Sequence, residues 1–116
     1  MQTAFLVKIL SALIVLVPTD PIAAEPIESI GAERCGGPVQ RHEVEFLAPE
    51  ATQVIVVAKV LRDGKTDATA ASISIDGKPC TGAGCGFRAE KGRTYRLLAE
   101  TTAQGFDDLC ISVGRP

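Results

Sequence analysis

Apolar and polar residues alternate along most of the chain beyond residue 39, a pattern typical of β-strands with one buried face. The clearest case is the stretch 41–46. There His42, Val44 and Phe46 share one face, while an arginine and two glutamates occupy the other. Because successive side chains of a strand point to opposite faces, this stretch predicts a half-buried strand.

The next apolar stretch, 52–61, differs because β-branched residues occupy both of its faces. Val54 and Val56 share one face, and Ile55 and Val57 share the other. Residues of this kind on both faces favour a central strand. We therefore expect this strand to be covered on each side.

Shorter alternating stretches at 71–76, 87–89, 94–102 and 109–113 predict four more strands. Turn residues separate most of them, including an Asp-Gly pair at 63–64 of the kind that forms tight hairpins. No helical period is evident after residue 24. The pattern predicts an all-β fold, a small antiparallel β-sandwich or partly open barrel of about six to seven strands.

The N-terminal segment has a different pattern, that of a secretory signal peptide. Lys8 precedes the apolar run 9–17, Pro18 ends the run, and 22–24 supplies small residues for a peptidase. The run is shorter than the ~20 residues that cross a bilayer. We expect cleavage after Ala24 or Ala23, and the alternative is an uncleaved membrane anchor.

These patterns divide the chain into three parts. Residues 1–24 form the cleaved signal peptide, residues 25–38 a flexible lead-in, and residues 39–116 the β domain. The predicted location is therefore periplasmic or secreted. No cysteine directly follows the expected cleavage site, which argues against a lipid-anchored form.

Four cysteines lie in the exported part, and an even number in a small exported domain predicts two disulfides. Three pairings are possible. We favour Cys80–Cys85, because the glycine-rich loop between these residues closes easily, and this leaves Cys35–Cys110. Since Cys110 alternates with the apolar residues of the last strand, the long bridge should lie outside the main core.

Composition narrows the range of partners. The net charge is −2, and it is unchanged by removal of the signal, which holds one lysine and one aspartate. A small, mixed charge argues against nucleic acid and anionic lipid as partners. The chain has no Asn, so N-linked glycosylation is excluded, and it has no Trp, which argues against a carbohydrate-binding module.

Candidate catalytic groups are few. His42 is the only histidine and falls on the apolar face of its strand, which predicts a packed, hydrogen-bonded side chain. A Ser–His–Asp triad assembles in space, so sequence alone leaves it open. The serines of the exported part lack any local nucleophile motif; they are Ser29, Ser72, Ser74 and Ser112.

Metal, redox and phosphate sites are equally unsupported. Cys80 and Cys85 approach the spacing of zinc ligands, but Cys35 and Cys110 stand alone, and no C-x-x-C is present. The glycines at 82–86 lack the spacing and the following helix of a phosphate loop. We interpret the acidic loop residues as solvated turn residues; they are Asp63, Asp67, Asp107 and Asp108. No cofactor, metal site or catalytic residue is predicted.

The stretch 42–113 resembles the small β-sandwich accessory domains found beside bacterial secreted peptidases. The shared features are the opening strand, the turn at 91–95 that leads into a strand, and a terminal apolar strand. These features are common to sandwiches, so no residue role is transferred from the resemblance.

The sequence therefore predicts an exported, non-enzymatic binding or interaction module with an unknown ligand. We expect its partner to be a protein or another component of the cell envelope, and we expect no stable membrane anchor after signal cleavage. One alternative is a small secreted inhibitor that uses the disulfide-closed loop 80–85 as a rigid element. Another is a hydrolase with an unrecognised site. An apolar patch on a sheet face or edge would favour the first, a protruding loop the second, and a deep polar pocket containing His42 the third.

Overall fold

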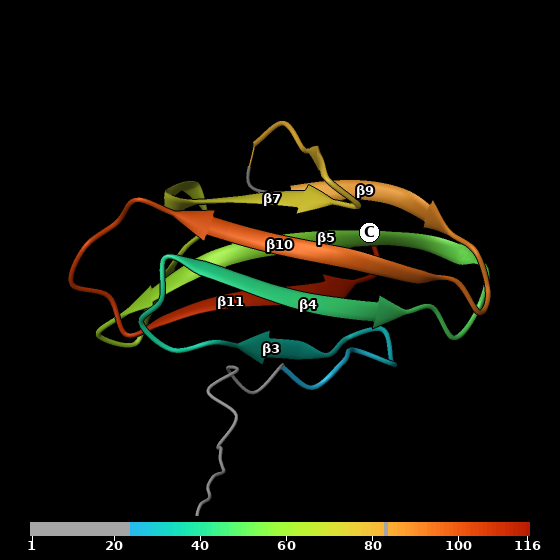
Figure 1. Ribbon diagram of the computed structural model, residues 1–116, viewed down its shortest axis with the longest axis horizontal. Coiled ribbons are helices and arrows are strands. Elements are labelled where there is room, and N and C mark those ends of the chain that lie inside the picture. The colour runs from blue at the N-terminus through green and yellow to red at the C-terminus, as the bar shows by residue number, and fades with distance from the viewer. Residues whose placement is uncertain (1–23, 83) are drawn as a thin grey trace, which may run out of the picture.

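The protein is a two-layered antiparallel β-sandwich, which confirms the predicted fold class (Figure 1). This is a computed structural model, and it describes residues 24–82 and 84–116. The predicted signal peptide lies outside the described residues except for Ala24. Within them, no helix is both long and apolar enough to cross a membrane.

The six predicted strands are all present, and three short ones accompany them. One sheet has the order β4-β10-β7-β8, and the other has the order β3-β11-β5-β6, with β9 also paired to β5. The predicted strands are β4 (Arg41–Leu47), β5 (Thr52–Arg62), β7 (Ala71–Ile75), β9 (Gly84–Ala89), β10 (Thr94–Thr101) and β11 (Asp108–Gly114). The short ones are β3 (Glu33–Cys35), β6 (Lys65–Asp67) and β8 (Lys78–Pro79), and a single 3₁₀ turn spans Ala68–Ala70.

Two Asp-Gly turns close the β5–β6 and β7–β8 hairpins. Asp63 and Asp76 both have φ of 51°, and the glycine after each also has positive φ. Positive φ at both central positions is the geometry of a two-residue type I′ hairpin turn, in which aspartate and glycine are favoured. The hairpin predicted at 63–64 is therefore confirmed, and a second one follows the same rule.

The core lies between the inner faces of the two sheets, and strict alternation supplies it. On β5 the buried residues are those of the Val54 face, and on β10 they are Tyr95, Leu97 and Ala99. The fully buried side chains contributed by β4 and β11 include Val44, Phe46, Leu109, Ile111 and Val113.

The expectation that β5 is covered on each side is wrong. β5 is a central strand, but among the described elements a second layer packs only on its inner face. Ile55 and Val57, on its outer face, are half-buried. Their neighbours on β9 are Gly84 and Gly86, so lateral contacts within the sheet shelter them instead of a covering layer.

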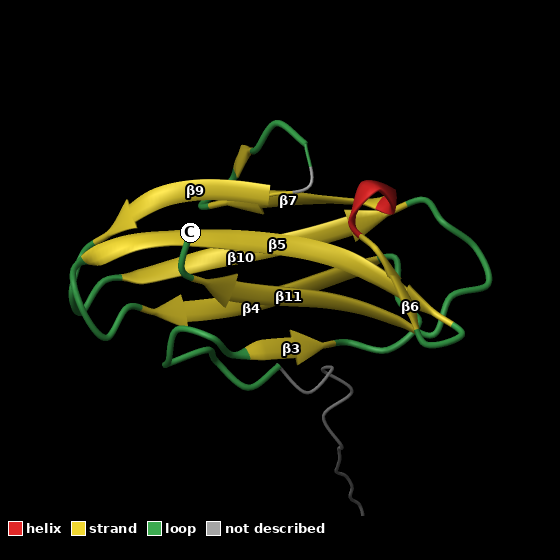
Figure 2. Ribbon diagram, turned by 180° about the vertical axis from the view of Figure 1, so that it is seen from behind, coloured by secondary structure: helices red, strands yellow, loops and turns green. Residues whose placement is uncertain are grey.

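The lead-in 25–38, expected to be flexible, packs against both sheets. Ile27 is fully buried and bridges Phe46 at the edge of β4, whereas Gly31 and Ala32 exchange backbone hydrogen bonds with Val113 of β11. We call this side, where residues 24–37 join the two sheets, the closed seam (Figure 2). Sequence reading missed it because one isolated buried isoleucine has no periodicity.

The structure brings both predicted cysteine pairs to disulfide-bonding distance. Cys110 pairs in register with Cys35 on β3 and with Lys59 on β5, on the side of β11 opposite to Leu109 and Ile111. It lies outside the core cluster yet is only 2% exposed, because strands flank it on both sides. The long bridge thus fixes the lead-in to the outer face of the sheet.

Candidate functional site

A mainly apolar pocket of about 390 Å³ lies between the sheet edges opposite the closed seam. Ile75 and the turn into β8 form one wall, and Cys85 and Phe87 of β9 form the other. Tyr95 of β10 contributes to the inner surface. We call this side, between the β7–β8 hairpin and β9, the open seam. The volume is within the range of small-ligand sites.

Aromatic contacts shape the inner part of the pocket. The ring of Phe87 lies 4.9 Å from that of Tyr95 at a tilted angle, and Phe46 stacks 6.0 Å behind it. The buried hydroxyl of Tyr95 accepts a hydrogen bond of 2.9 Å from the backbone N–H of Glu90. Tyr95 thus faces the core and also lines the pocket.

The rim carries more positive than negative charge. The guanidinium of Arg93 lies 4.8 Å above the Tyr95 ring and 3.4 Å from a carboxylate oxygen of Asp76. The other oxygen of Asp76 accepts a 2.8 Å hydrogen bond from the N–H of Arg96. Lys78 has no ion-pair partner within 4 Å among the described residues. An apolar group with an anionic substituent would therefore complement this site.

The second cysteine pair forms part of the pocket wall. Cys80 and Cys85 both line the pocket and are partly buried against the core. The loop between them rises above the N-terminal end of β9 (Figures 1 and 2). The bridge between these residues therefore fixes one side of the pocket opening.

A larger hollow, about 640 Å³, lies at one end of the β4-β10-β7 sheet, but its chemistry is weaker. Its charged residues, Arg41 and Glu100, pair with each other at 3.6 Å, and both are largely exposed. Threonine, serine and alanine side chains line most of the rest. It offers no apolar aromatic surface, so the open seam is the better candidate.

His42 lies at the closed seam and not in a polar cleft. Its Nε2 lies 3.3 Å from the carbonyl oxygen of Arg34, and Gly36 packs against its ring. Burial lowers the pKa of His42, partly offset by this carbonyl and by the charge of Asp108. The side chain is 7% exposed, in keeping with the packed role predicted for it.

The serines do not join His42 in a triad. Ser72 and Ser74 alternate with buried Ile73 on β7 and so lie on the outer face of their sheet, whereas His42 lies on the inner face of β4. Ser112 lies on the outer face of β11, and Ser29 is exposed in the lead-in. The described residues thus bring no serine and histidine together at the pocket.

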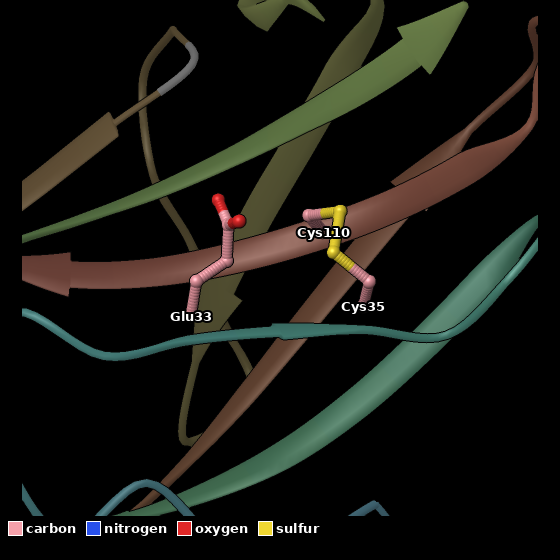
Figure 3. Close-up of side chains that lie close together, drawn as sticks. All are labelled: Glu33, Cys35 and Cys110. Carbon is pink, nitrogen blue, oxygen red and sulfur yellow. A yellow bond between two sulfur atoms is a disulfide. The ribbon is translucent and has the colours of Figure 1, made fainter. Parts of the chain in front are cut away.

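Glu33, Cys35 and Cys110 form a cluster whose ligand-type atoms lie within 4.8 Å of one another (Figure 3). The two sulfurs face each other at bonding distance, and a disulfide sulfur lacks the thiolate that a metal requires. The carboxylate of Glu33 is engaged by Lys59 at 2.7 Å. The cluster is therefore structural in its oxidised form.

The acidic loop residues bond to backbone groups of the turns. Asp107 accepts the N–H of Asp63 at 3.0 Å, and Asp108 accepts the N–H of Gly37 at 2.8 Å. Asp67 caps the 3₁₀ turn by accepting from Thr69, and these hydrogen bonds lower its pKa. These carboxylates hold loops together and do not converge on one point.

Sequence reasoning missed Ile75, Phe87 and Arg93 as members of one site. Each belongs to a predicted strand or turn, but the pocket depends on how the β7–β8 hairpin and β9, which belong to different sheets, approach each other. One signal was available: the chain's only tyrosine lies just beyond Arg93, and Phe87 lies just beyond a cysteine.

A solved structure with a similar fold is the pre-peptidase C-terminal domain of a collagenase from Bacillus anthracis. The two chains are 13% identical with a TM-score of 0.50, and the match covers 81% of this chain and 99% of that one. A likeness at this identity shows the fold alone. No protein-family model matches the sequence, and no curated protein matches it.

Proposed function

We propose that the protein is an exported, non-enzymatic binding module whose ligand site is the pocket of the open seam. One observation carries this proposal: the pocket combines an apolar aromatic interior with a cationic rim. Pockets of this kind bury an apolar group and orient it with a few polar contacts. The N-terminal signal pattern and the two cysteine pairs support export.

The dye 1-anilinonaphthalene-8-sulfonate tests this site, because it joins an aromatic body to an anion. We expect saturable binding of one dye per folded domain. Phe87→Ser should weaken binding by about tenfold, because it removes one apolar wall of the pocket. Val39→Ser is the matched control, since Val39 is an exposed apolar residue that does not line the pocket.

Near-ultraviolet circular dichroism must show that both variants keep native packing, because this dye also binds loosely packed states. Equal affinity in wild type and the Phe87→Ser variant would contradict the proposed site. Loss of binding in the Val39→Ser variant would contradict it too, because the dye would then be reporting general surface.

A second candidate, a secreted inhibitor, has one observation in its favour: the loop between Cys80 and Cys85 stands above the sandwich (Figure 1). Of its described residues, Thr81 and Gly82 are exposed and small, and Gly84 is half-buried at the start of β9. Inhibition of a panel of purified peptidases tests this function. Inhibition by wild type that is lost in the Cys80→Ser, Cys85→Ser double variant would favour an inhibitor over a pocket binder.

A further inference from the structure

We propose that the free edge of β9 binds an extended acidic peptide segment of a partner protein as an added strand. In this arrangement one apolar side chain of the peptide occupies the open-seam pocket. The inference deepens the proposed function and rests on it, because it names the class of ligand. It starts from the way in which this protein treats the edges of its two sheets.

Most edges of the sandwich are short, charged or already covered. Ile27 caps the edge of β4 with backbone hydrogen bonds of 2.8 and 2.9 Å. β8 has two residues, Lys78 and Pro79, whereas β3 and β6 have three residues each, including charged ones. Proline, charge, shortness and cover are the devices that prevent a sheet edge from pairing with another strand.

β9 lacks these devices. It has six residues, Gly-Cys-Gly-Phe-Arg-Ala, with a single charge and no proline, and among the described strands it pairs with β5 alone. Figures 1 and 2 both show β9 along the rim of the sandwich, with the loop after β8 above only its N-terminal end. Within it Gly86 and Arg88 are exposed and Phe87 is half-buried, whereas Ala89 is buried. The stretch 86–88 is therefore the accessible part of this edge, along which the alternate N–H and C=O groups that do not face β5 lie.

A strand added at this edge would place its side chains in register with those of β9. Cys85 and Phe87 of β9 lie opposite Val56 and Val54, whose side chains face the core. Directly opposite residues of neighbouring strands share a face of the sheet. A peptide residue opposite Phe87 would thus point between the two sheets, which is where the pocket lies.

The charges on each side of this edge favour an acidic peptide. Lys78 and Arg88 are exposed, and neither has an ion-pair partner within 4 Å in the described part of the chain. Asp76, which lines the pocket with Lys78, is occupied by Arg93 and by the backbone N–H of Arg96. β9 has no acidic residue, so the β9 edge of a second copy would supply Arg88 and no acid to match these cations. The occupant is therefore a segment of another protein.

A panel of short synthetic peptides tests the inference. Each peptide has a central stretch of Thr with one Phe at a varied position, and its two ends carry either Glu or Lys. We expect Glu-ended peptides to bind more tightly than Lys-ended ones. In nuclear magnetic resonance spectra they should shift the amide signals of residues 86–88 and slow the hydrogen exchange of the alternate amides that face away from β5.

Backbone N-methylation gives a test that leaves the protein unchanged. A strand bonds to its neighbour through the N–H groups of alternate residues. In the peptide that binds most tightly, methylating the N–H groups of one set of alternate residues should abolish binding. Methylating those of the other set should leave the affinity unchanged. If both methylated peptides bind equally well, the peptide does not add as a strand and the inference is overturned.

Lys78→Glu tests the charge preference, and Lys65→Glu is its matched control. Both lysines are exposed and follow an Asp-Gly turn in a two-residue hairpin, but only Lys78 lines the pocket. Lys78→Glu should lower the affinity for the Glu-ended peptide by about tenfold, and Lys65→Glu should leave this affinity unchanged. Equal effects of the two substitutions would overturn the inference.

Two further outcomes would also overturn it. In one, the dye binds but no peptide protects the β9 amides from hydrogen exchange. The pocket would then be a small-molecule site. The other is concentration-dependent protection of β9 without peptide, which would identify a second copy as the occupant. Absence of both dye and peptide binding would overturn the proposed function as well, so the two failures are distinguishable.

Discussion

The two sides of this sandwich differ in how the gap between the two sheets is closed. At the closed seam the lead-in joins β4 to β11, and Cys35–Cys110 fixes β3 beside them. At the open seam no segment of the described chain bridges β8 to β9 except the short loop between Cys80 and Cys85. One side is filled by a buried isoleucine, whereas the other keeps a pocket.

Under the proposed function, the seam that stabilises the fold is separate from the seam that binds a ligand. The lead-in ties the two sheets together through backbone hydrogen bonds to β4 and β11. The bridge, which spans 75 positions of sequence, fixes β3 at the end of the lead-in to β11 within one sheet. The open seam can then leave apolar surface and a strand edge available without loss of the fold. Exposed apolar surface and an undefended edge are costs that a stable domain accepts mainly where they serve recognition.

The largest loss of unfolding free energy should come from a substitution in the core that both seams enclose. Val56→Asp should unfold the domain, with a loss of more than about 4 kcal/mol, because Val56 is fully buried and a charge would lack a partner there. Glu45→Lys is the control: Glu45 is exposed on the outer face of β4, and the change should stay within about 0.5 kcal/mol. Urea denaturation measures both, and the reverse order would mean that the strand register is wrong.

The next prediction compares the two bridges directly. Replacing Cys35 and Cys110 by Ser should cost about 4–5 kcal/mol of unfolding free energy, because their bridge closes a long loop of the unfolded chain. Replacing Cys80 and Cys85 by Ser should cost about 2 kcal/mol, since that loop is short. Denaturation of both double variants measures the difference. Equal losses would show that the closed seam is not the main covalent constraint.

The strands and the core could be predicted from sequence, because alternation is local and strong. The hairpin at Asp63-Gly64 could also be predicted from the sequence, since a turn with positive φ at both central positions selects those residues. The two seams could not be predicted. Ile27 gives no periodic signal, and the cover expected over Ile55 and Val57 depends on which elements reach that face. The pocket depends on how the β7–β8 hairpin and β9, which are close in sequence but belong to different sheets, approach each other.

Gly36→Ala should weaken the closed seam at a single point. A Cβ at this position would lie 2.5 Å from Nδ1 of the buried His42 ring, so the ring or the backbone must shift. We expect a loss of about 1–3 kcal/mol, as for overpacking of a filled site. Gly114→Ala is the matched control, because its Cβ would meet nothing within 4 Å. A neutral Gly36→Ala would show that the seam is loosely packed. Dye binding at the open seam should survive both substitutions.

The smallest expected effect is a pH dependence confined to the closed seam. Burial lowers the pKa of His42 below its ordinary value of 6.5, so the folded protein takes up this proton less readily than the unfolded chain does. Stability from His42 is therefore fully present above pH 6.5 and is lost as the pH falls toward the folded pKa. Because His42 is the only histidine, its replacement shows whether a decrease in unfolding free energy between pH 7 and 5.5 comes from it. Urea denaturation at the two pH values should show this decrease in wild type and not in His42→Gln. A decrease that persists in His42→Gln would place the titrating group elsewhere and remove this distinction between the seams.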